Sequence, residues 1–223
     1  MATQALEWDK TGEHFYESGV SKGVLYVLSD EGKYDKGVAW NGLTNVTETP
    51  SGAEENAIYA DNIKYASLRS TEEIGGTIEA YTYPDEWNQC DGNGELTKGV
   101  HVAQQERKTF GLCYRTEIGN DTSTESDDGY KLHLVYGATA SPSERSYDTQ
   151  NDNPDAVQFS WEYTTNPVNV AGFKPTSLIT IDSRTADKEK LTALETVLYG
   201  SSTAAARLPL PDEVKTLMTV GGR

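Results

Sequence analysis

The strongest constraint on the fold is a pair of alternating segments that flank a polar connection. Polar and apolar side chains alternate with a period of two along Arg107–Ile118 and again along Tyr130–Ala140. This period is typical of β-strands with one buried face. The connection Gly119–Gly129 contains only glycine and polar residues, which is typical of a mobile loop tip. We therefore predict a long β-hairpin, and with it a mainly β fold.

Shorter patterns extend this prediction. The segment Gly75–Cys90 alternates as a strand until Pro84, which is suited to the first turn of a short helix. Asp155–Thr165 alternates as another strand. The dipeptide Asn41-Gly42 predicts a type I′ turn that joins Val38–Trp40 to Leu43–Thr49 as a hairpin.

One α-helix is expected in the second half of the chain. Leu191, Leu194, Val197 and Leu198 form an apolar stripe within Asp187–Tyr199, and Gly200 supplies a stop. The expected fold is a β-sandwich or partial barrel with this one flanking helix, long hairpins and terminal arms. We divide the chain into an N-terminal arm (1–22), a β domain (23–200) and a C-terminal arm (201–223).

Composition limits the classes of partner. The chain has 223 residues and a net charge of −16, which argues against a protein that grips nucleic acid through its phosphates. We find no apolar run of the ~20 residues that a membrane-spanning helix needs, and no signal-peptide pattern at the N-terminus. Cys90 and Cys113 are expected to be reduced thiols, because they lack metal-binding or redox spacing.

The search for chemistry returns ordinary structural explanations. His14, His101 and His133 have no His or Cys partner at metal-ligand spacing. Nucleophile-elbow, phosphate-loop and dinucleotide motifs are absent from the sequence. Glu79 and Glu162 fall on polar strand faces. We therefore expect no catalytic residue, no metal and no cofactor, and an enzyme is the least favoured class.

Several segments resemble one protein family. They are Trp8–Tyr26, Gly37–Glu54, Tyr59–Gly92, Arg107–Asp121, Tyr130–Glu144 and Leu208–Val214, which includes the sequences GVAWNGLTNVTETPSGAE, GTIEAYTYPDEWNQCDG and LPLPDEV. Together they resemble the major tail tube protein of long-tailed, non-contractile bacteriophages of the siphovirus type that infect Gram-positive hosts. The resemblance covers nearly the whole chain in order. It weakens in Thr122–Asp128 and after Val214.

The resemblance implies a structural function. Members of the family form rings, expected here to be hexameric, whose hairpins make one continuous inner β-barrel. The rings stack into a tube around the tape measure protein between tail tip (initiator) and terminator proteins, and DNA passes through the lumen without specific binding. The fold is shared with the inner tube of type VI secretion. The implied localisation is the virion tail, with the host cytoplasm before assembly. The family offers no catalytic residues to transfer, and no membrane is involved.

Two sets of residues are assigned to this function. We expect the long hairpin Arg107–Ile118 and Tyr130–Ala140 to supply lumen-facing strands, and Met1–Lys22, Asn41–Asn62 and the C-terminal tail to make contacts within or between rings. The expected lumen-facing residues are Arg115, Glu117, Lys131, His133 and Glu162. The expected inter-subunit residues are Trp8, Phe15, Tyr16, Trp40 and Leu217.

The alternative class is a monomeric β-sandwich that binds carbohydrate. Such a module would stack a sugar on Trp40, Trp87, Tyr81 or Trp161. Ordinary solvated strand faces and disordered termini also explain the polar faces and arms. Ring or filament formation at high concentration separates the tube subunit from the monomeric module.

Overall fold

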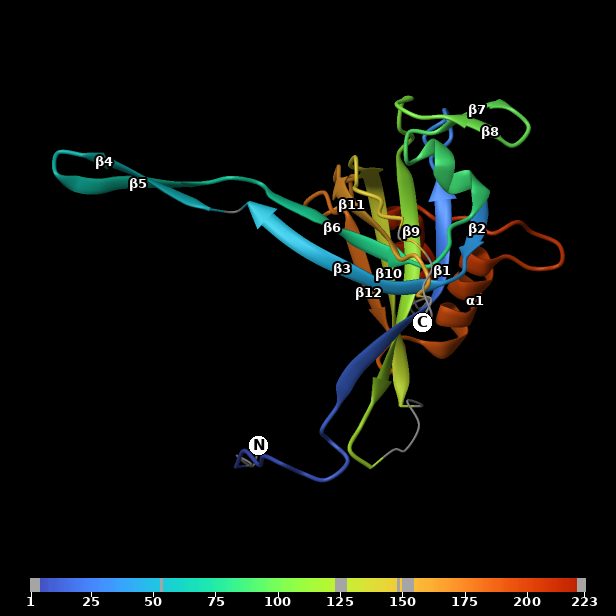
Figure 1. Ribbon diagram of the computed structural model, residues 1–223. Helices are drawn as coiled ribbons and strands as arrows, with labels where there is room; N and C mark the ends of the chain where they lie inside the picture. Colours follow the sequence, from blue (N-terminus) through green and yellow to red (C-terminus); the bar gives the residue numbers. More distant parts are fainter. Residues whose placement is uncertain (1–4, 53, 123–127, 148, 150–154, 220–223) are drawn as a thin grey trace.

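The structure is a computed structural model that describes residues 5–52, 54–122, 128–147, 149 and 155–219. These described residues are mainly β and form twelve strands, two α-helices and one 3₁₀ helix, which Figure 1 shows. The strands are β1 (Tyr16–Val27), β2 (Gly37–Trp40), β3 (Leu43–Gly52), β4 (Glu55–Ala60), β5 (Ile63–Arg69), β6 (Glu72–Ala80), β7 (Gly94–Thr97), β8 (Val100–Val102), β9 (Phe110–Gly119), β10 (Gly129–Ala140), β11 (Phe159–Thr165) and β12 (Leu178–Asp182). The helices are η1 (Asp85–Gln89), α1 (Lys188–Tyr199) and α2 (Pro211–Met218).

One strongly curved antiparallel sheet forms the body. Its strand order is β2-β1-β9-β10-β11-β6-β3, and β12 also pairs with β10. The first and last strands of this order, β2 and β3, are joined only by Asn41 and Gly42. The sheet has therefore curled until its two edges meet, and a Cβ on Gly23 of β1 would lie 2.2 Å from the Leu43 side chain of β3. This geometry is the partial barrel expected from the sequence.

Two apolar clusters lie on opposite sides of the central strands. The first fills the inside of the curl and includes Leu112 of β9, Ile78 of β6 and Trp161 of β11, all 0–1% exposed. The second lies outside it, where Leu194 of α1 and Val214 of α2 pack on Leu134 of β10. β9 and β10 are consequently buried on both faces, because the barrel interior covers one face and the helices cover the other.

The long hairpin and the helix predicted from sequence are confirmed. β9 and β10 pair from Phe110 to Ile118, although the tip that we expected to be mobile lies mostly outside the described residues. α1 begins after Asp187, whose carboxylate accepts hydrogen bonds from the backbone N–H groups of Glu189 and Lys190. A second helix, α2, begins with Pro211.

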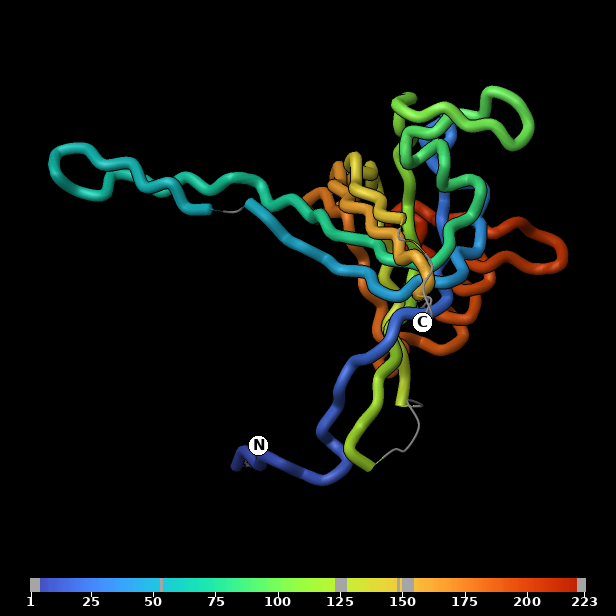
Figure 2. Tube along the Cα trace, in the orientation of Figure 1, coloured from blue at the N-terminus to red at the C-terminus, as the bar shows by residue number. Residues whose placement is uncertain are grey.

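The prediction of a hairpin at Asn41-Gly42 is wrong. β2 pairs with β1, whereas β3 pairs with β6, and of the two central residues only Gly42 has a positive φ. A type I′ turn needs positive φ at both. Asp61 and Asn62 meet that condition, with φ of 52° and 63°, and they join β4 to β5. The β4–β5 hairpin continues the direction of β3 and β6 and projects far from the body (Figures 1 and 2).

The limits of both arms also change. β1 begins at Tyr16 and pairs with β9 from there, so the expected boundary at residue 22 falls inside a strand. At the other end, Leu208 pairs with Tyr34, and α2 packs against the second cluster. Residues 201–219 are therefore part of the body, and residues 1–4 and 220–223 lie outside the described part.

Candidate functional site

The outer face of β3, β6 and β11 is a polar surface of the sheet. Residues directly opposite one another in antiparallel strands point to the same face. Thr47, Thr77 and Glu162 are aligned in this way, as are Asn45, Glu79 and Ser160. Ile78 and Trp161, next to them in sequence, point inward into the first cluster. The outer face of these strands is thus polar, while α1 and α2 pack on the opposite side of the molecule.

This polar face carries carboxylates and no cation. It consists of Asn45, Thr47, Thr49, Ser51, Glu73, Gly75, Thr77, Glu79, Ser160, Glu162 and Thr164. The Glu79 carboxylate accepts hydrogen bonds from Gln158 Nε2 at 3.2 Å and Asn45 Nδ2 at 3.4 Å. Neither Lys nor Arg is among these residues, so the potential at the face is negative.

A free strand edge borders the polar face. β3 ends the strand order, and its outer edge has no strand partner within the described chain. β3 pairs with β6 along its other edge. From the inside of the curl, the Tyr163 hydroxyl donates a hydrogen bond to the Thr47 carbonyl of β3 at 3.2 Å. Gly76 makes this possible, since a Cβ there would lie 1.9 Å from that carbonyl oxygen. A long unpaired edge of this kind is a site for pairing with another chain.

The expected lumen-facing residues do not share one face. In the β9–β10 register Arg115 lies opposite Leu132, and Tyr114 lies opposite His133. Arg115 and Glu117 therefore point to the helix side, whereas Lys131 and His133 point to the barrel interior. We correct the assignment of these four residues to a common lumen face. Glu162 is exposed on the polar face of β11.

Arg115 belongs to a half-buried cluster beneath α1. Its guanidinium carbon lies 3.9 Å from the centre of the Tyr130 ring, and its Nη2 lies 3.2 Å from the Glu117 carboxylate. Burial, together with the nearby Glu195 carboxylate, raises the pKa of Tyr130 to about 12. These contacts join β9 and β10 to the helix and leave Arg115 little freedom to meet another molecule.

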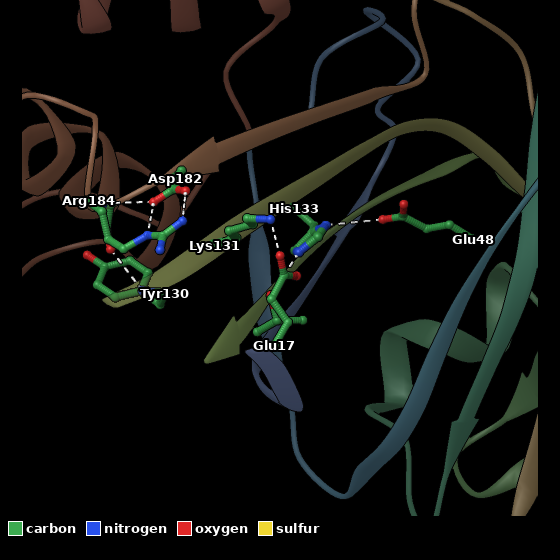
Figure 3. Close-up of polar contacts among 9 residues, drawn as sticks. Glu17, Glu48, Tyr130, Lys131, His133, Asp182 and Arg184 are labelled. Atoms are coloured by element: carbon green, nitrogen blue, oxygen red, sulfur yellow. Dashed lines mark hydrogen bonds and ion pairs between the residues drawn. The ribbon is translucent and has the colours of Figure 1, made fainter. Parts of the chain in front are cut away.

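His133 and Lys131 also have partners within the chain (Figure 3). The His133 ring stacks on Tyr114, with centroids 4.6 Å apart, and its Nδ1 lies 3.1 Å from Glu48 of β3. The Tyr114 hydroxyl donates to the same carboxylate. The hydrogen bond from His133 is the main reason that the pKa of Glu48 lies below its usual value. Lys131 pairs with Glu17 of β1. This cluster ties β3 to the opposite wall of the curl.

Of the expected inter-subunit residues, three are exposed and one is not. Trp8, Phe15 and Tyr16 are 75%, 51% and 49% exposed, so contact with another subunit stays a prediction for them. Trp40 is only 3% exposed, packs on Trp87 and Trp161, and donates its Nε1 hydrogen to the Thr82 carbonyl. It is a core residue, and we withdraw it as a contact residue. Leu217 of α2 is partly buried against the second cluster.

Among the described strands, the most exposed aromatic side chains lie on the projecting β4–β5 hairpin. Tyr59 is 69% exposed and Tyr65 is 73% exposed, and Ile63 and Leu68 exceed 50%. A two-stranded hairpin is marginally stable by itself in water. Exposed apolar side chains on such an extension mark a surface for contact with another molecule.

The aromatic residues considered for sugar stacking are mostly buried. Trp87 and Trp161 lie in the first cluster with Trp40, at 0–1% exposure, and only Tyr81, at 53%, faces solvent. Three of the four side chains that would form the stacking platform are therefore unavailable to a ligand. Nothing in the structure favours the carbohydrate-binding alternative.

Three further observations complete the survey. Cys90 and Cys113 are free and buried, in agreement with the expectation of reduced thiols, and burial raises the pKa of each to about 12. Within the described ranges, no group of three or more His, Cys, Asp or Glu side chains is arranged to hold a metal ion. None of the described helices has the length and apolar character needed to cross a membrane.

Comparison with known proteins adds two distant likenesses. No protein-family model matches the chain, and no curated protein matches it. A sheath/tube terminator of an extracellular contractile injection system, PVC, is 14% identical over 79% of this chain and 99% of its own, with a TM-score of 0.30. A chain of the PVC sheath–tube complex is 13% identical over 72% of this chain and 88% of its own, also with a TM-score of 0.30. Both TM-scores lie below 0.5, and we base no argument on either likeness.

Proposed function

We propose that this chain is a structural subunit of a bacteriophage tail tube, which assembles with copies of itself into stacked rings. The observation that carries the proposal is the broad polar face of β3, β6 and β11, which lacks cations and lies beside the free edge of β3. The sequence resemblance, which runs in order over nearly the whole chain, supports the same function and implies six copies in each ring.

The polar face is the surface that we assign to the lumen. We assign the lumen to this face instead of to the β9–β10 hairpin, because that hairpin is buried on both faces. DNA carries one negative charge per ~1.7 Å of duplex, and proteins that hold it do so with Lys and Arg. A bore lined by Glu79, Glu162 and hydroxyl side chains repels phosphates and supplies no cation to retain them. DNA would therefore pass without being bound.

The free edge of β3 is the surface that we assign to ring closure. Its unpaired N–H and C=O groups would pair with a strand of the neighbouring subunit, so that the inner sheets of all copies join into one barrel. A closed barrel has no free edges. Each subunit would present one surface to the neighbour on one side and a different surface to the other, which closes a ring when the rotation allows.

The projections supply the remaining contacts. Residues 5–15 and the β4–β5 hairpin extend from the body (Figure 2) and carry exposed Trp8, Tyr59 and Tyr65. We assign them to contacts within and between rings. The tape measure protein inside the bore, and the tip and terminator proteins at the ends, are the further partners that the resemblance implies. The function is structural and needs no catalytic residue or cofactor, and its place is the virion tail.

The test combines assembly with the accessibility of an introduced thiol. The two native cysteines are fully buried, so a bulky maleimide reports only on introduced ones. Thr164→Cys places a thiol on the polar face, and Thr192→Cys places one on the exposed side of α1. Electron microscopy of concentrated protein should show rings or tubes. Both variants should react as monomers, and only Thr192→Cys should react in tubes.

Two results contradict the proposal. One is protein that stays monomeric at high concentration even with preformed tube ends as initiators. The other is tubes in which Thr164→Cys reacts as fast as in the monomer, because the polar face would then lie outside the bore.

A further inference from the structure

Arg107, just before β9, is a cation without a partner among the residues that the structure describes. Every other arginine in the described ranges makes an ion pair; these are Arg69, Arg115, Arg145, Arg184 and Arg207. Within the same ranges Arg107 makes neither an ion pair nor a side-chain hydrogen bond, and its Nε has neither an acceptor nor exposed surface. A partly buried guanidinium without an acceptor is unfavourable. It is also unexpected in a chain that holds 35 acidic residues and only 19 Lys and Arg.

Arg107 lines an open cleft at one end of the β9–β10 hairpin. The cleft has a volume of about 550 Å³, and Asn93, Gln104, Gln105, Ser143 and Arg145 also line it. That volume is ample for one inserted side chain and a short stretch of backbone. Arg145 is balanced by Asp91, to which its Nη2 donates. Among the described residues that line the cleft, the net charge is therefore the single positive charge of Arg107.

The backbone holds Arg107 in position before any ligand arrives. Gln105 N–H donates to the Gly92 carbonyl and Lys108 N–H donates to the Gln89 carbonyl, both at 2.9 Å. The guanidinium lies over Gly92, where an added Cβ would be 3.1 Å from the guanidinium carbon. Gly92 also has a φ of 74°, which favours glycine. Because the site is already ordered, a ligand would lose little free energy in organising it.

We propose that this cleft binds a carboxylate from residues 5–15 of a second copy of the chain. The cleft lies where β9 begins and β10 ends, and residues 5–15 lie at the opposite end of the same hairpin (Figures 1 and 2). Head-to-tail stacking therefore brings residues 5–15 of one copy to the cleft of the next. Each copy gives one contact and receives one, which propagates along an open stack.

Residues 5–15 have the chemistry that the cleft needs. The Asp9 side chain is 94% exposed, and its Oδ1 lies 3.7 Å from His14 Nε2. Glu13 is exposed and makes no side-chain ion pair or hydrogen bond within the described ranges. A carboxylate can accept two parallel N–H groups from one guanidinium, and the amide side chains of the cleft can bond the accompanying backbone. Exposed Leu6 and Trp8 add apolar contact area.

The inference rests on the stacking of rings in the proposed function, and its test separates the two. Assembly of full-length protein is measured by sedimentation and electron microscopy for Arg107→Gln and for Lys174→Gln, which removes the same charge outside the cleft. Arg107→Gln should raise the concentration needed for stacking about tenfold or more, equivalent to the loss of one charge-assisted hydrogen-bond pair. Lys174→Gln should leave it unchanged. Isolated rings should still form in both.

A direct binding measurement covers the case in which a variant folds poorly. A fluorescent peptide of residues 5–16 should bind the folded wild-type protein. Binding should weaken about tenfold with Arg107→Gln, or with Gln, Asn and Gln in place of Glu7, Asp9 and Glu13, the three acidic residues of the peptide. Thermal unfolding of each variant confirms that it is folded. The inference is overturned if Arg107→Gln leaves the concentration needed for stacking unchanged. It is also overturned if the peptide does not bind, or if it binds equally well without its acidic side chains. Rings that form in that case leave the proposed function standing.

Discussion

Replacing Glu48 by Ala should destabilise the fold, because this carboxylate joins β3 to the opposite wall of the curled sheet. It accepts hydrogen bonds from the Tyr114 hydroxyl and from His133 Nδ1. Tyr114 and His133 are only 3% and 9% exposed. Truncation leaves both donors without an acceptor while their side chains remain buried.

The magnitude follows from the number of donors and their access to water. One unsatisfied buried donor costs about 1–3 kcal/mol. The Glu48 side chain is 28% exposed, so water can enter part of the vacated space, and the lower half of that range applies to each donor. For the two donors together we expect a loss of about 2–4 kcal/mol. For a chain of this length that corresponds to a fall in Tm of about 4–16 °C.

Glu48→Gln is the matched control, since its amide oxygen can still accept one of the two hydrogen bonds. It removes the charge and one of the two hydrogen bonds, and it should cost about 1 kcal/mol at pH 7. The pKa of Glu48 in the folded chain is lowered from 4.5. A carboxylate whose pKa is lower in the folded state than in the unfolded state stabilises the fold at pH values above its unfolded-state pKa. This stabilisation is lost as the pH falls through the folded-state pKa. The advantage of the wild type over Glu48→Gln should therefore be full near pH 7 and shrink below about pH 4.5.

The assay is thermal and urea unfolding followed by circular dichroism between pH 3 and pH 7. An Ala variant that unfolds within 0.5 kcal/mol of the wild type would refute the reasoning, as would a wild-type advantage over Gln that grows as the pH falls. Either result would mean that the two donors find water or other acceptors when the carboxylate is absent.

Two further substitutions probe the supports of the polar face and of the helix. Gly76→Ala should cost about 2 kcal/mol or more in urea unfolding, because its Cβ would lie 1.9 Å from the Thr47 carbonyl oxygen. Gly94→Ala, whose Cβ first meets the flexible Gln105 side chain at 3.2 Å, should cost clearly less, and equal losses would count against the steric explanation. Asp187→Ala should cost about 1 kcal/mol, because its carboxylate caps two N–H groups of α1. Asp187→Asn should retain most of that stability in the same measurement, and an Asn variant as unstable as Ala would argue against capping.

Local sequence patterns were sufficient to predict the strands and the helix, but not to predict which strands pair with one another. The alternation along β9 and β10 predicted their hairpin, and the stripe of Leu191, Leu194 and Leu198 predicted α1. The Asn41-Gly42 dipeptide predicted a hairpin that does not form. Instead β2 pairs with β1 and β3 pairs with β6, at the two edges of the curled sheet. A turn motif reports the local backbone and carries no information about long-range pairing.

Because long-range pairing cannot be read from local patterns, only some of the site residues were predicted correctly. Polar residues that alternate with Ile78 and Trp161 indicated the polar face of β6 and β11, and Glu162 was assigned to it from the sequence. Arg115 and His133 were assigned to one face, yet a register shift of one residue between two strands changes which side chains share a face. The burial of Trp40 in the core contradicts its expected contact role, because the sequence of a single strand does not reveal which of its faces another layer will cover.

The order of residues alone determined the period-two strands, the capped helix, the acidic charge and the family resemblance, because each depends on neighbours within a few positions or on the chain as a whole. Only the tertiary structure decided which face stays uncovered and, among the described residues, that the outer edge of β3 has no strand partner and that Arg107 has no ion-pair partner. Those three features depend on distances between residues far apart in sequence, and the packing of the curled sheet sets these distances.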